Sequence, residues 1–554
     1  MSIISIENLS NEVFYIIFDY LDGYHIYKAF FNLNDRFQQL LNSSSLLFKI
    51  KLNSPTDEIY TKIFEQLLLI NRHQIYSLHL WILQNEHFFS SFPIDSSLDH
   101  LESLALARIK LTTLSSLLSN LTYLPRLFSL TIDAWRTLKD LSDVYRLIFT
   151  LLKLKYIKCI AEDLKRSISL PFALKNQTST IEHLVIDHSC TFKELSTILS
   201  YTPQLRHLHF SHLNDSYPII QITILPMILS NLSYISFNVH YIRFDEFKMF
   251  VTNINCKLKV LYYTTRSQDM TFLEANRWEQ LFQRYFPRLE KFHFQYYKPL
   301  NFEYKSPIYP EDPNPFISSF WIERKWILEA EMRSFEVVYS ISPYKKRWYD
   351  DNSSSEIFKS TRFTVTCLPR QEELEILMMN ISSILTLTQI YHLEIPQRQI
   401  FSSSLIDIIN VLSELDSFKI HSLSLSPTRN SSVEEIALRN VSNKNKITKV
   451  CLQKMIEIEE IYYLMKLCPR MNYLQVDYIN NINIELFVQD ILQKVQNEHN
   501  QYLRSLCFLV PTIENEMVKK LEEMIHSQKL FFHYMIKRHY TINRVVNSIY
   551  LEWK

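Results

Sequence analysis

Residues 202–210 have the sequence Thr-Pro-Gln-Leu-Arg-His-Leu-His-Phe, and this stretch decides the fold. Its apolar residues Leu205, Leu208 and Phe210 follow the pattern apolar-x-x-apolar-x-apolar. Residues two apart on a strand share a face, so Leu208 and Phe210 predict a short strand with one buried side. Pro203 ends a preceding helix and favours extended backbone at its neighbour. The stretch therefore predicts a helix, a proline stop and a half-buried strand.

The same apolar pattern recurs along the chain at a spacing of about 26 residues. Four copies share the proline lead-in, at residues 124–127, 202–205, 286–289 and 468–471. The copies are Ile75/Leu78/Leu80, Leu101/Leu104/Leu106, Leu127/Leu130/Ile132, Leu154/Ile157/Cys159, Ile181/Leu184/Ile186, Leu205/Leu208/Phe210, Leu232/Ile235/Phe237, Leu258/Leu261/Tyr263, Leu289/Phe292/Phe294, Ile390/Leu393/Ile395, Ile420/Leu423/Leu425, Ile447/Val450/Leu452, Met471/Leu474/Val476 and Leu503/Leu506/Phe508. We also expect a copy at Met332/Phe335/Val337.

This period indicates a repeat architecture with the layout of leucine-rich repeats. A single short strand cannot bury its leucines, but stacked neighbours remove them from water. Each fully buried leucine then contributes about 1.5 to 3 kcal/mol. Single copies arise by chance in a leucine-rich chain, whereas the regular spacing favours true repeats. We therefore predict an α/β fold with a leucine-rich-repeat-like solenoid, parallel strands on its concave side and helices outside.

A separate helical module is predicted within residues 9–37. Ser10 is a suitable N-cap, and Asp22 with Gly23 ends the first helix before a second begins near His25. The first helix has too many apolar residues for one stripe, namely Val13, Phe14, Ile16, Ile17, Phe18 and Leu21. It therefore needs cover on two sides, and a partner would supply the second.

This module resembles the F-box, a run of Leu-Pro-x-Glu-Leu-Leu, then Ile-Leu, then Leu-Asp, and later Arg with an aromatic residue. The matching residues are Leu9, Glu12, Val13, Phe14, Ile17, Phe18, Leu21, Asp22, Ile26, Arg36 and Phe37. Two positions depart from the pattern, because Ser10 replaces the usual proline and Asn34 stands where cysteine often lies. An F-box followed by leucine-rich-type repeats resembles the F-box/LRR class of receptors.

The resemblance implies a substrate-recognition subunit of an SCF-type (cullin-RING) ubiquitin ligase, which is not itself an enzyme. In that class the F-box binds a Skp-type adaptor and through it a cullin, while the repeats hold an unknown protein substrate. The implied adaptor-binding residues are Leu9, Glu12, Val13, Ile17, Phe18, Leu21 and Ile26. We expect their apolar members to be buried only when the adaptor binds.

The expected domain organisation has four parts. Residues 1–50 form the F-box module, 51–298 a first block of repeats, 299–385 an irregular insertion, and 386–554 a second block with a C-terminal cap. The insertion combines prolines with aromatic residues, which suits either a recognition loop or structural packing over a solenoid edge. Within it, the run Lys345-Lys-Arg-Trp348 is expected to be a solvated turn.

Composition excludes several function classes. The 554 residues are 47% hydrophobic and 21% charged with a net charge of +1, so a folded chain without a global field for nucleic acid or membrane is expected. Gly23 is the only glycine, which excludes the glycine-rich phosphate loops of P-loop, dinucleotide-binding and kinase-type proteins. The seven dispersed cysteines predict reduced thiols, and the start lacks a secretory signal, so a cytoplasmic or nuclear protein is expected.

Candidate target-binding residues lie on the face of the predicted strands opposite the leucines. They are Trp81, His183, Asp187, His207, His209 and His293. His207 and His209 have a spacing that suits metal ligands, but no carboxylate or cysteine accompanies them at ligand spacing, so a protein-recognition surface is favoured. We expect no metal, cofactor or catalytic residue. Two alternatives stay open: a repeat scaffold without a ligase role, and a hydrolase on a repeat scaffold.

Overall fold

The computed structural model is a mixed α/β fold with 14 helices and 20 strands of open, mostly parallel sheet among the residues it describes. These residues are 6–52, 71–81, 89, 92–135, 140–161, 168–213, 226–299, 316–349, 361–367, 381–382, 384–385, 388–396, 399–425, 432–479, 484–497, 502–509, 515–527, 540–545 and 548–553. The chain forms two compact units, Met1–Thr271 with Gln280–Lys291, and Phe272–Glu279 with Phe292–Lys554. The expected α/β class is thereby confirmed.

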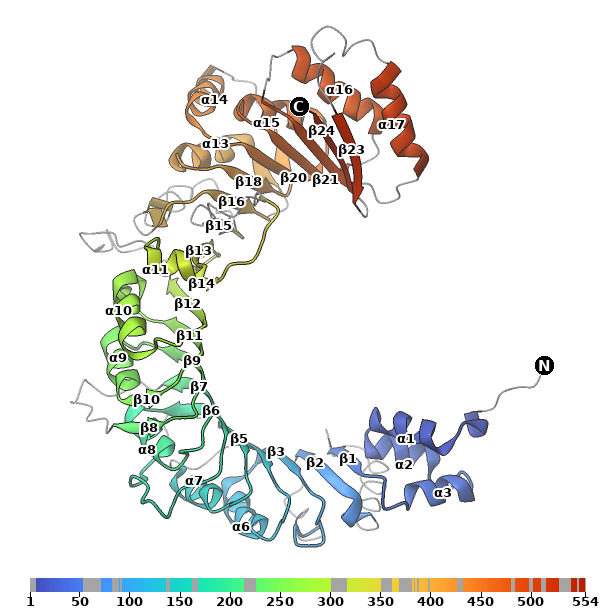
Figure 1. The fold of residues 1–554 in the computed structure, drawn as a ribbon, viewed down its shortest axis with the longest axis vertical. Helices are drawn as coiled ribbons and strands as arrows, with labels where there is room; N and C mark the ends of the chain where they lie inside the picture. Colours follow the sequence, from blue (N-terminus) through green and yellow to red (C-terminus); the bar gives the residue numbers. More distant parts are fainter. Residues whose placement is uncertain are drawn as a thin grey trace. The chain divides into compact units, whose positions relative to one another are not determined.

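The first unit begins with helices and continues as alternating strands and helices (Figure 1). Its helical elements are η1 (Ile6–Asn8), α1 (Asn11–Asp19), α2 (Gly23–Phe30), α3 (Asp35–Leu41), η2 (Arg72–Gln74), α6 (Leu111–Leu121), α7 (Ser142–Phe149), α8 (Phe192–Ser200) and α9 (Phe244–Thr252). Its strands are β1 (Phe48–Leu52), β2 (Ile75–Trp81), β3 (Ser103–Ile109), β4 (Ser129–Ala134), β5 (Tyr156–Ala161), β6 (His183–Cys190), β7 (His207–Leu213), β8 (Met227–Leu229), β9 (Tyr234–His240), β10 (Ile254–Cys256) and β11 (Val260–Arg266). Residues of η3 (Met270–Leu273) and α10 (Ala275–Tyr285) are divided between the two units.

Successive strands of the first unit pair in parallel from β1 to β7 and on through β9 to β11. The register aligns the predicted apolar positions, so that Leu184 lies opposite Leu208 and Leu208 opposite Ile235. Helices α6 to α9 lie on one side of these strands (Figure 1). All the predicted apolar triplets from Ile75/Leu78/Leu80 to Leu258/Leu261/Tyr263 are buried, which confirms this part of the sequence pattern.

Local signals start the helices between these strands, and α8 is the clearest case. The Thr191 hydroxyl accepts a hydrogen bond from the backbone N–H of Glu194 at 3.2 Å, and the Glu194 carboxylate accepts one from the backbone N–H of Thr191 at 2.6 Å. This reciprocal capping box satisfies two backbone donors that the helix itself leaves unpaired. The same carboxylate accepts from the backbone N–H of Ile168, which ties a neighbouring loop to the helix start.

We expect Thr191→Ala to lower the free energy of unfolding by about 0.5 to 2 kcal/mol, because the cap and its reciprocal bond are lost. Thr252→Ala is the matched control, since that hydroxyl donates only to the Met249 carbonyl in the last turn of α9. Denaturant unfolding of the two variants beside the wild type measures the difference. Equal stability of both variants would contradict the capping role.

The second unit continues the parallel strands but includes antiparallel pairs. Its strands are β12 (Lys291–Pro299), β13 (Trp326–Met332), β14 (Glu336–Pro343), β15 (Arg362–Val365), β16 (His392–Ile395), β17 (Ile400–Phe401), β18 (Ser417–Ile420), β19 (Leu423–Ser424), β20 (Lys449–Met455), β21 (Tyr473–Ile479), β22 (Ser505–Leu509), β23 (Tyr540–Val545) and β24 (Ser548–Trp553). Its helices include α11 (Ser319–Arg324), α13 (Ser402–Val411), α14 (Ser432–Lys444), α15 (Glu459–Leu467), α16 (Ile484–Asn497) and α17 (Asn515–Ser527). Parallel pairing runs from β13 through β15, β16, β18, β20 and β21 to β22, while β14 and β24 pair antiparallel with their neighbours.

The copy expected at Met332/Phe335/Val337 is wrong. Met332 ends β13, Phe335 is 77% exposed at the turn, and Val337 belongs to the antiparallel strand β14. The spacing matches the repeat pattern by coincidence, because Met332 and Val337 are five residues apart but lie on the two antiparallel strands of one hairpin.

The copy expected at Ile420/Leu423/Leu425 has the wrong register. Strand β18 ends at Ile420, and the buried apolar residues in and just before it are Leu415, Phe418 and Ile420. These three residues satisfy the same apolar pattern five positions earlier, so the sequence contained two overlapping candidates.

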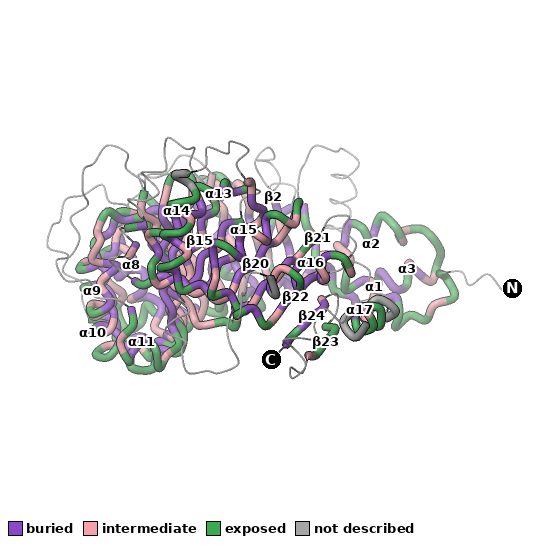
Figure 2. The backbone as a smooth tube through the Cα atoms, turned by 90° about the horizontal axis from the view of Figure 1, so that it is seen from above, coloured by how far each residue is buried: buried purple, intermediate pink, exposed green. Residues whose placement is uncertain are grey.

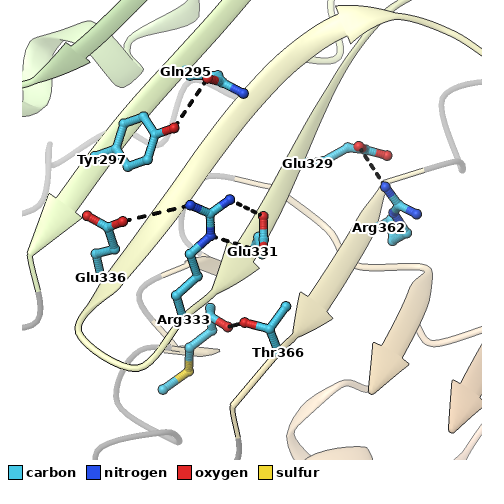
Figure 3. A network of polar contacts seen from close by, with 9 residues as sticks. Gln295, Tyr297, Glu329, Glu331, Arg333, Glu336, Arg362 and Thr366 are labelled. Carbon is cyan, nitrogen blue, oxygen red and sulfur yellow. Dashed lines mark hydrogen bonds and ion pairs between the residues drawn. The ribbon is translucent and has the colours of Figure 1, made fainter. Parts of the chain in front are cut away.

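Ion pairs hold the tip of the β13–β14 hairpin (Figure 3). Arg333 donates two hydrogen bonds to the Glu331 carboxylate, at 3.0 and 2.9 Å, and lies 3.9 Å from Glu336. Its guanidinium also lies over the ring of Tyr297 on β12, 5.8 Å from the ring centre. The described part of the expected insertion at 299–385 therefore includes sheet strands and not only irregular chain.

Candidate protein-binding surfaces

An aromatic cluster packs the three N-terminal helices together. Phe14 is fully buried and makes an edge contact with Phe37 of α3 at 4.9 Å between ring centres. Phe18 makes a similar contact with Phe30 of α2 at 5.2 Å. Asn34 caps α3 by accepting a hydrogen bond from the backbone N–H of Phe37 at 3.0 Å. The module thus has a core of its own.

Arg36 fixes the segment that leads into α1. Its guanidinium donates to the Asn11 side chain at 2.9 Å and to the backbone carbonyls of Glu7 and Leu9. It also lies over the Phe14 ring, 5.4 Å from the ring centre. Arg36 thereby positions Leu9 beside the first turn of α1.

The first turn of α1 is also favourable for a carboxylate. Ser10 is the N-cap residue, and its hydroxyl, followed by a backbone N–H and by the charge of Arg36, lowers the pKa of Glu12. The Glu12 side chain is exposed and ionised, so it is free to meet a basic or hydrogen-bonding group of a partner.

The side of α1 that faces away from the aromatic core carries an exposed apolar stripe, here named the α1 apolar face. Val13, Ile16 and Tyr20 are 38%, 58% and 87% exposed, although large apolar side chains normally avoid such exposure when they lie together. The complete face comprises Leu9, Val13, Ile16, Ile17, Tyr20 and Leu21, of which Leu9, Ile17 and Leu21 are half-buried. Exposed stretches of these helices are green in Figure 2.

Two of the apolar residues predicted to bind the adaptor, Phe18 and Ile26, are not on this surface. Phe18 is 3% exposed and Ile26 is 2% exposed, so both belong to the core of the folded module. Phe18 lies one turn after Phe14 on the inner side of α1, where Phe30 covers it. The expectation that these two become buried only with the adaptor is therefore wrong. Ile16 and Tyr20 were missed as site residues, although their three- and four-residue spacing from Val13 and Ile17 was a usable signal.

A row of rings crosses the strand face of the first unit opposite the leucines. Tyr156, His183, His207 and Tyr234 are register partners on β5, β6, β7 and β9. The rings of His183 and His207 stack at 4.2 Å with an interplanar angle of 7°, and His207 lies 5.4 Å from Tyr234. All four side chains are half-buried, so one side of each remains accessible. We name these four residues the ring row.

Two imidazoles on this face, those of His207 and His209, are shifted toward the neutral form. Burial lowers the pKa of His207, and the neighbouring charges of His183 and Arg206 lower it further. Burial also lowers the pKa of His209. The charge of Lys158 lowers this pKa further, whereas the charge of Asp187 acts in the opposite direction. Neutral imidazoles present both a donor and an acceptor to a bound protein.

We expect acidification to destabilise the chain in part through these two histidines. Because the pKa of each is lower in the folded chain, unfolding takes up protons, so their stabilising contribution is present above about pH 6.5 and is lost as the pH falls through the folded value. The double variant His207→Gln/His209→Gln should therefore lose less stability than the wild type between about pH 7.5 and about pH 5. Denaturant unfolding at the two pH values measures this. An unchanged pH dependence would show that other groups control it.

The structure brings together four of the six predicted target-binding residues. His183, Asp187, His207 and His209 lie on adjacent strands β6 and β7. Trp81 also lies in the first unit but at the end of β2, with the Arg108 guanidinium 5.9 Å from its ring centre.

His293 is in β12 and belongs to the second unit. Across the described parts of the chain, no group of three or more His, Cys, Asp or Glu side chains is placed to hold a metal ion.

The run Lys345-Lys-Arg-Trp348 is not a solvated turn as expected. Lys345 and Lys346 are exposed, but the Arg347 side chain is only 15% exposed and forms an ion pair with Glu329. Tyr349, the next residue, is 2% exposed. An acidic partner from β13 and ring partners from distant strands explain the burial, and none of them is close in sequence.

No protein-family model matches the chain, and no curated protein matches it. Among the helices that the structure describes, none has the length and apolar character needed to span a membrane.

Proposed function

We propose that this protein is the substrate-recognition subunit of an SCF-type ubiquitin ligase. In this proposal the N-terminal helices act as an F-box that binds a Skp-type adaptor, and the strand and helix repeats form a leucine-rich-repeat-like solenoid that holds the target protein. The observation that carries the proposal is the α1 apolar face, which lies on the helix whose residues resemble the F-box.

The argument for an adaptor rests on what the helical module leaves uncovered. Its aromatic core is complete within the chain, since Phe14 and Phe37 are fully buried. The exposed Val13, Ile16 and Tyr20 therefore contribute nothing to that core. An aliphatic and aromatic stripe of this kind supports a protein interface, because a partner removes it from water without disturbing the module. The half-buried Leu9 and Ile17 extend the stripe.

The argument for a target-binding role rests on the strand face of the first unit. The ring row presents two tyrosines and two histidines, which combine apolar area with hydrogen-bonding atoms. Such rings are common at protein interfaces and lose little conformational entropy on binding. In this role the chain performs no chemistry. It increases the effective concentration of the target beside the transfer subunits.

The proposal is tested by co-expressing the full chain with a Skp-type adaptor and purifying through either partner. A one-to-one complex that recruits the cullin and RING subunits, and that ubiquitinates a co-purified protein, is the expected result. Failure of the wild type to bind the adaptor would overturn the proposal. Adaptor binding without cullin-dependent ubiquitination would favour a scaffold, and turnover of generic ester or phosphate substrates by the purified chain would favour a hydrolase.

A further inference from the structure

The segment 344–349, here named the strap, crosses the strand face of the second unit. It leaves the end of β14, where the Tyr344 backbone N–H donates to the Lys325 carbonyl at 2.7 Å. Arg347 pairs with Glu329 of β13, and its guanidinium donates to the Tyr349 hydroxyl at 2.6 Å. Figure 1 shows the chain passing from β14 across the strands toward β20 and β21.

The aromatic residues of the strap contact the far strands of the same face. The Tyr349 ring stacks on His392 of β16, with ring centres 3.6 Å apart and an interplanar angle of 17°. The Trp348 ring lies 6.4 Å from that of Tyr473 on β21. The Lys449 ammonium group on β20 donates to the Tyr349 carbonyl at 2.7 Å. The strap thus contacts the four strands β13, β16, β20 and β21 through one guanidinium, two aromatic rings and one backbone carbonyl.

The strap covers the strand face of the second unit, whereas the equivalent strand face of the first unit is accessible. His392 and Ser417 are register partners on β16 and β18, and they are 5% and 0% exposed. Their counterparts in the first unit, His183 and His207, are half-buried. Since all four residues lie on the strand face opposite the buried leucine positions, the strap accounts for the difference in exposure.

The covered face has a defined chemistry. Glu329 also pairs with Arg362 at 3.3 Å, and Arg362 pairs with Glu394 at 3.0 Å, so Glu329 offers a carboxylate that is already oriented (Figure 3). Burial disfavours a charged guanidinium at Arg347, but Glu329 and Tyr349 outweigh it and raise the pKa of Arg347. Beyond the carboxylate lie two aromatic contact points, the imidazole of His392 and the phenol of Tyr473.

Apart from the backbone hydrogen bond between Tyr344 and Lys325, each contact described between the strap and the strand face involves at least one side chain. In the described residues, 344–349 forms no strand pairing with the face it crosses. The buried Nε1 of Trp348 has no hydrogen-bond partner among all the residues that the structure describes, so the strap does not satisfy every polar atom at its contact with the face. A peptide with the same pattern of groups would make the same contacts and satisfy the face equally well.

We propose that the strand face of β13, β16, β20 and β21 is a recognition surface for an extended peptide with an arginine followed by aromatic residues, and that the strap occupies it as an intramolecular competitor. This proposal stands independently of adaptor binding. The strap is tethered beside the face and therefore competes with a peptide in solution. The apparent affinity of the wild type for such a peptide is proportional to the fraction of molecules in which the strap is displaced.

The test uses a fluorescent peptide with the sequence of residues 342–349, Ser-Pro-Tyr-Lys-Lys-Arg-Trp-Tyr. The full-length variant Arg347→Ser/Trp348→Ser/Tyr349→Ser should bind it at least about tenfold more tightly than the wild type, as measured by fluorescence anisotropy. Adding Glu329→Gln to that variant should weaken binding again. The control is Lys345→Ala, which removes an exposed charge of the strap and should leave the wild-type affinity unchanged.

Equal or absent peptide binding by the folded triple variant and the wild type would overturn the proposal. So would binding that is indifferent to Glu329→Gln. If the triple variant does not fold, Tyr349→Ala provides the second measurement, because it removes the ring that covers His392 and the hydroxyl that accepts from Arg347 but leaves the other side chains of the strap in place. Peptide binding by Tyr349→Ala that exceeds that of the wild type supports the proposal, and its absence overturns it.

Discussion

Replacing Ile16 with aspartate is expected to eliminate co-purification with the Skp-type adaptor. Ile16 is 58% exposed in the middle of the α1 apolar face, so the module folds without its side chain. In a complex, the new carboxylate would be taken out of water against apolar groups without a partner charge. Loss of a central anchor alone costs more than about 2 kcal/mol, which corresponds to a roughly thirtyfold loss of affinity. The unpaired carboxylate should increase that loss.

The comparison variants separate binding from folding. Ile17→Asp should behave like Ile16→Asp, while Leu9→Ala should cause a smaller loss because it only truncates the edge of the face. Leu152→Asp is the matched control, since Leu152 is 73% exposed in the repeat region and lies on no part of the α1 apolar face. Affinity is measured by titration with purified adaptor, with thermal unfolding as the folding control. Wild-type affinity for both Ile16→Asp and Ile17→Asp would remove the F-box assignment and leave a repeat-based interaction protein.

The sequence predicted the existence of the first helix better than its orientation. Ser10 was correctly predicted as the N-cap of α1. The predicted cover on a second side of this helix stays a prediction, because Val13, Ile16 and Tyr20 are exposed. However, Phe14 and Phe18 look equivalent to Ile16 and Ile17 in sequence. The side that Phe30 and Phe37 cover is decided by contacts with α2 and α3. Helical periodicity alone could not provide this information.

Apolar periodicity predicted the repeated strands well wherever neighbours shared one register. In the second unit it failed at Met332/Phe335/Val337, where an antiparallel hairpin interrupts the parallel run between β13 and β15, while copies such as Met471/Leu474/Val476 are buried as predicted. A hairpin and a repeat strand both place apolar residues at short intervals, so Phe335 satisfied the pattern from an exposed turn. The distinction depends on strand direction, which a short apolar pattern does not encode.

The strap was misjudged because its contacts are distant in sequence. Arg347 is near Glu329, but Tyr349 contacts His392 and Lys449, and Trp348 contacts Tyr473. A short basic run is usually solvated, and nothing adjacent to it indicates a buried carboxylate. Only the folded arrangement of β13 to β21 supplies the partners.

Replacing Leu208 with alanine is expected to lower the free energy of unfolding by about 2 to 5 kcal/mol. Leu208 is fully buried in β7, and its register partners Leu184 and Ile235 lie on the two adjacent strands. The strands on both sides restrain the backbone, so the structure cannot collapse fully around the missing atoms, and a cavity adds to the lost transfer free energy.

Leu174→Ala removes the same atoms from a leucine that is 63% exposed in the same unit, and it should change stability by less than about 0.5 kcal/mol. Denaturant unfolding followed by tyrosine and tryptophan fluorescence compares the two variants with the wild type. A further variant, Leu184→Ala/Leu208→Ala, should deviate from the sum of the single effects, because both side chains line one cavity. If Leu208→Ala costs no more than Leu174→Ala, the apolar rows of β6, β7 and β9 are not the packed core that stabilises the repeats.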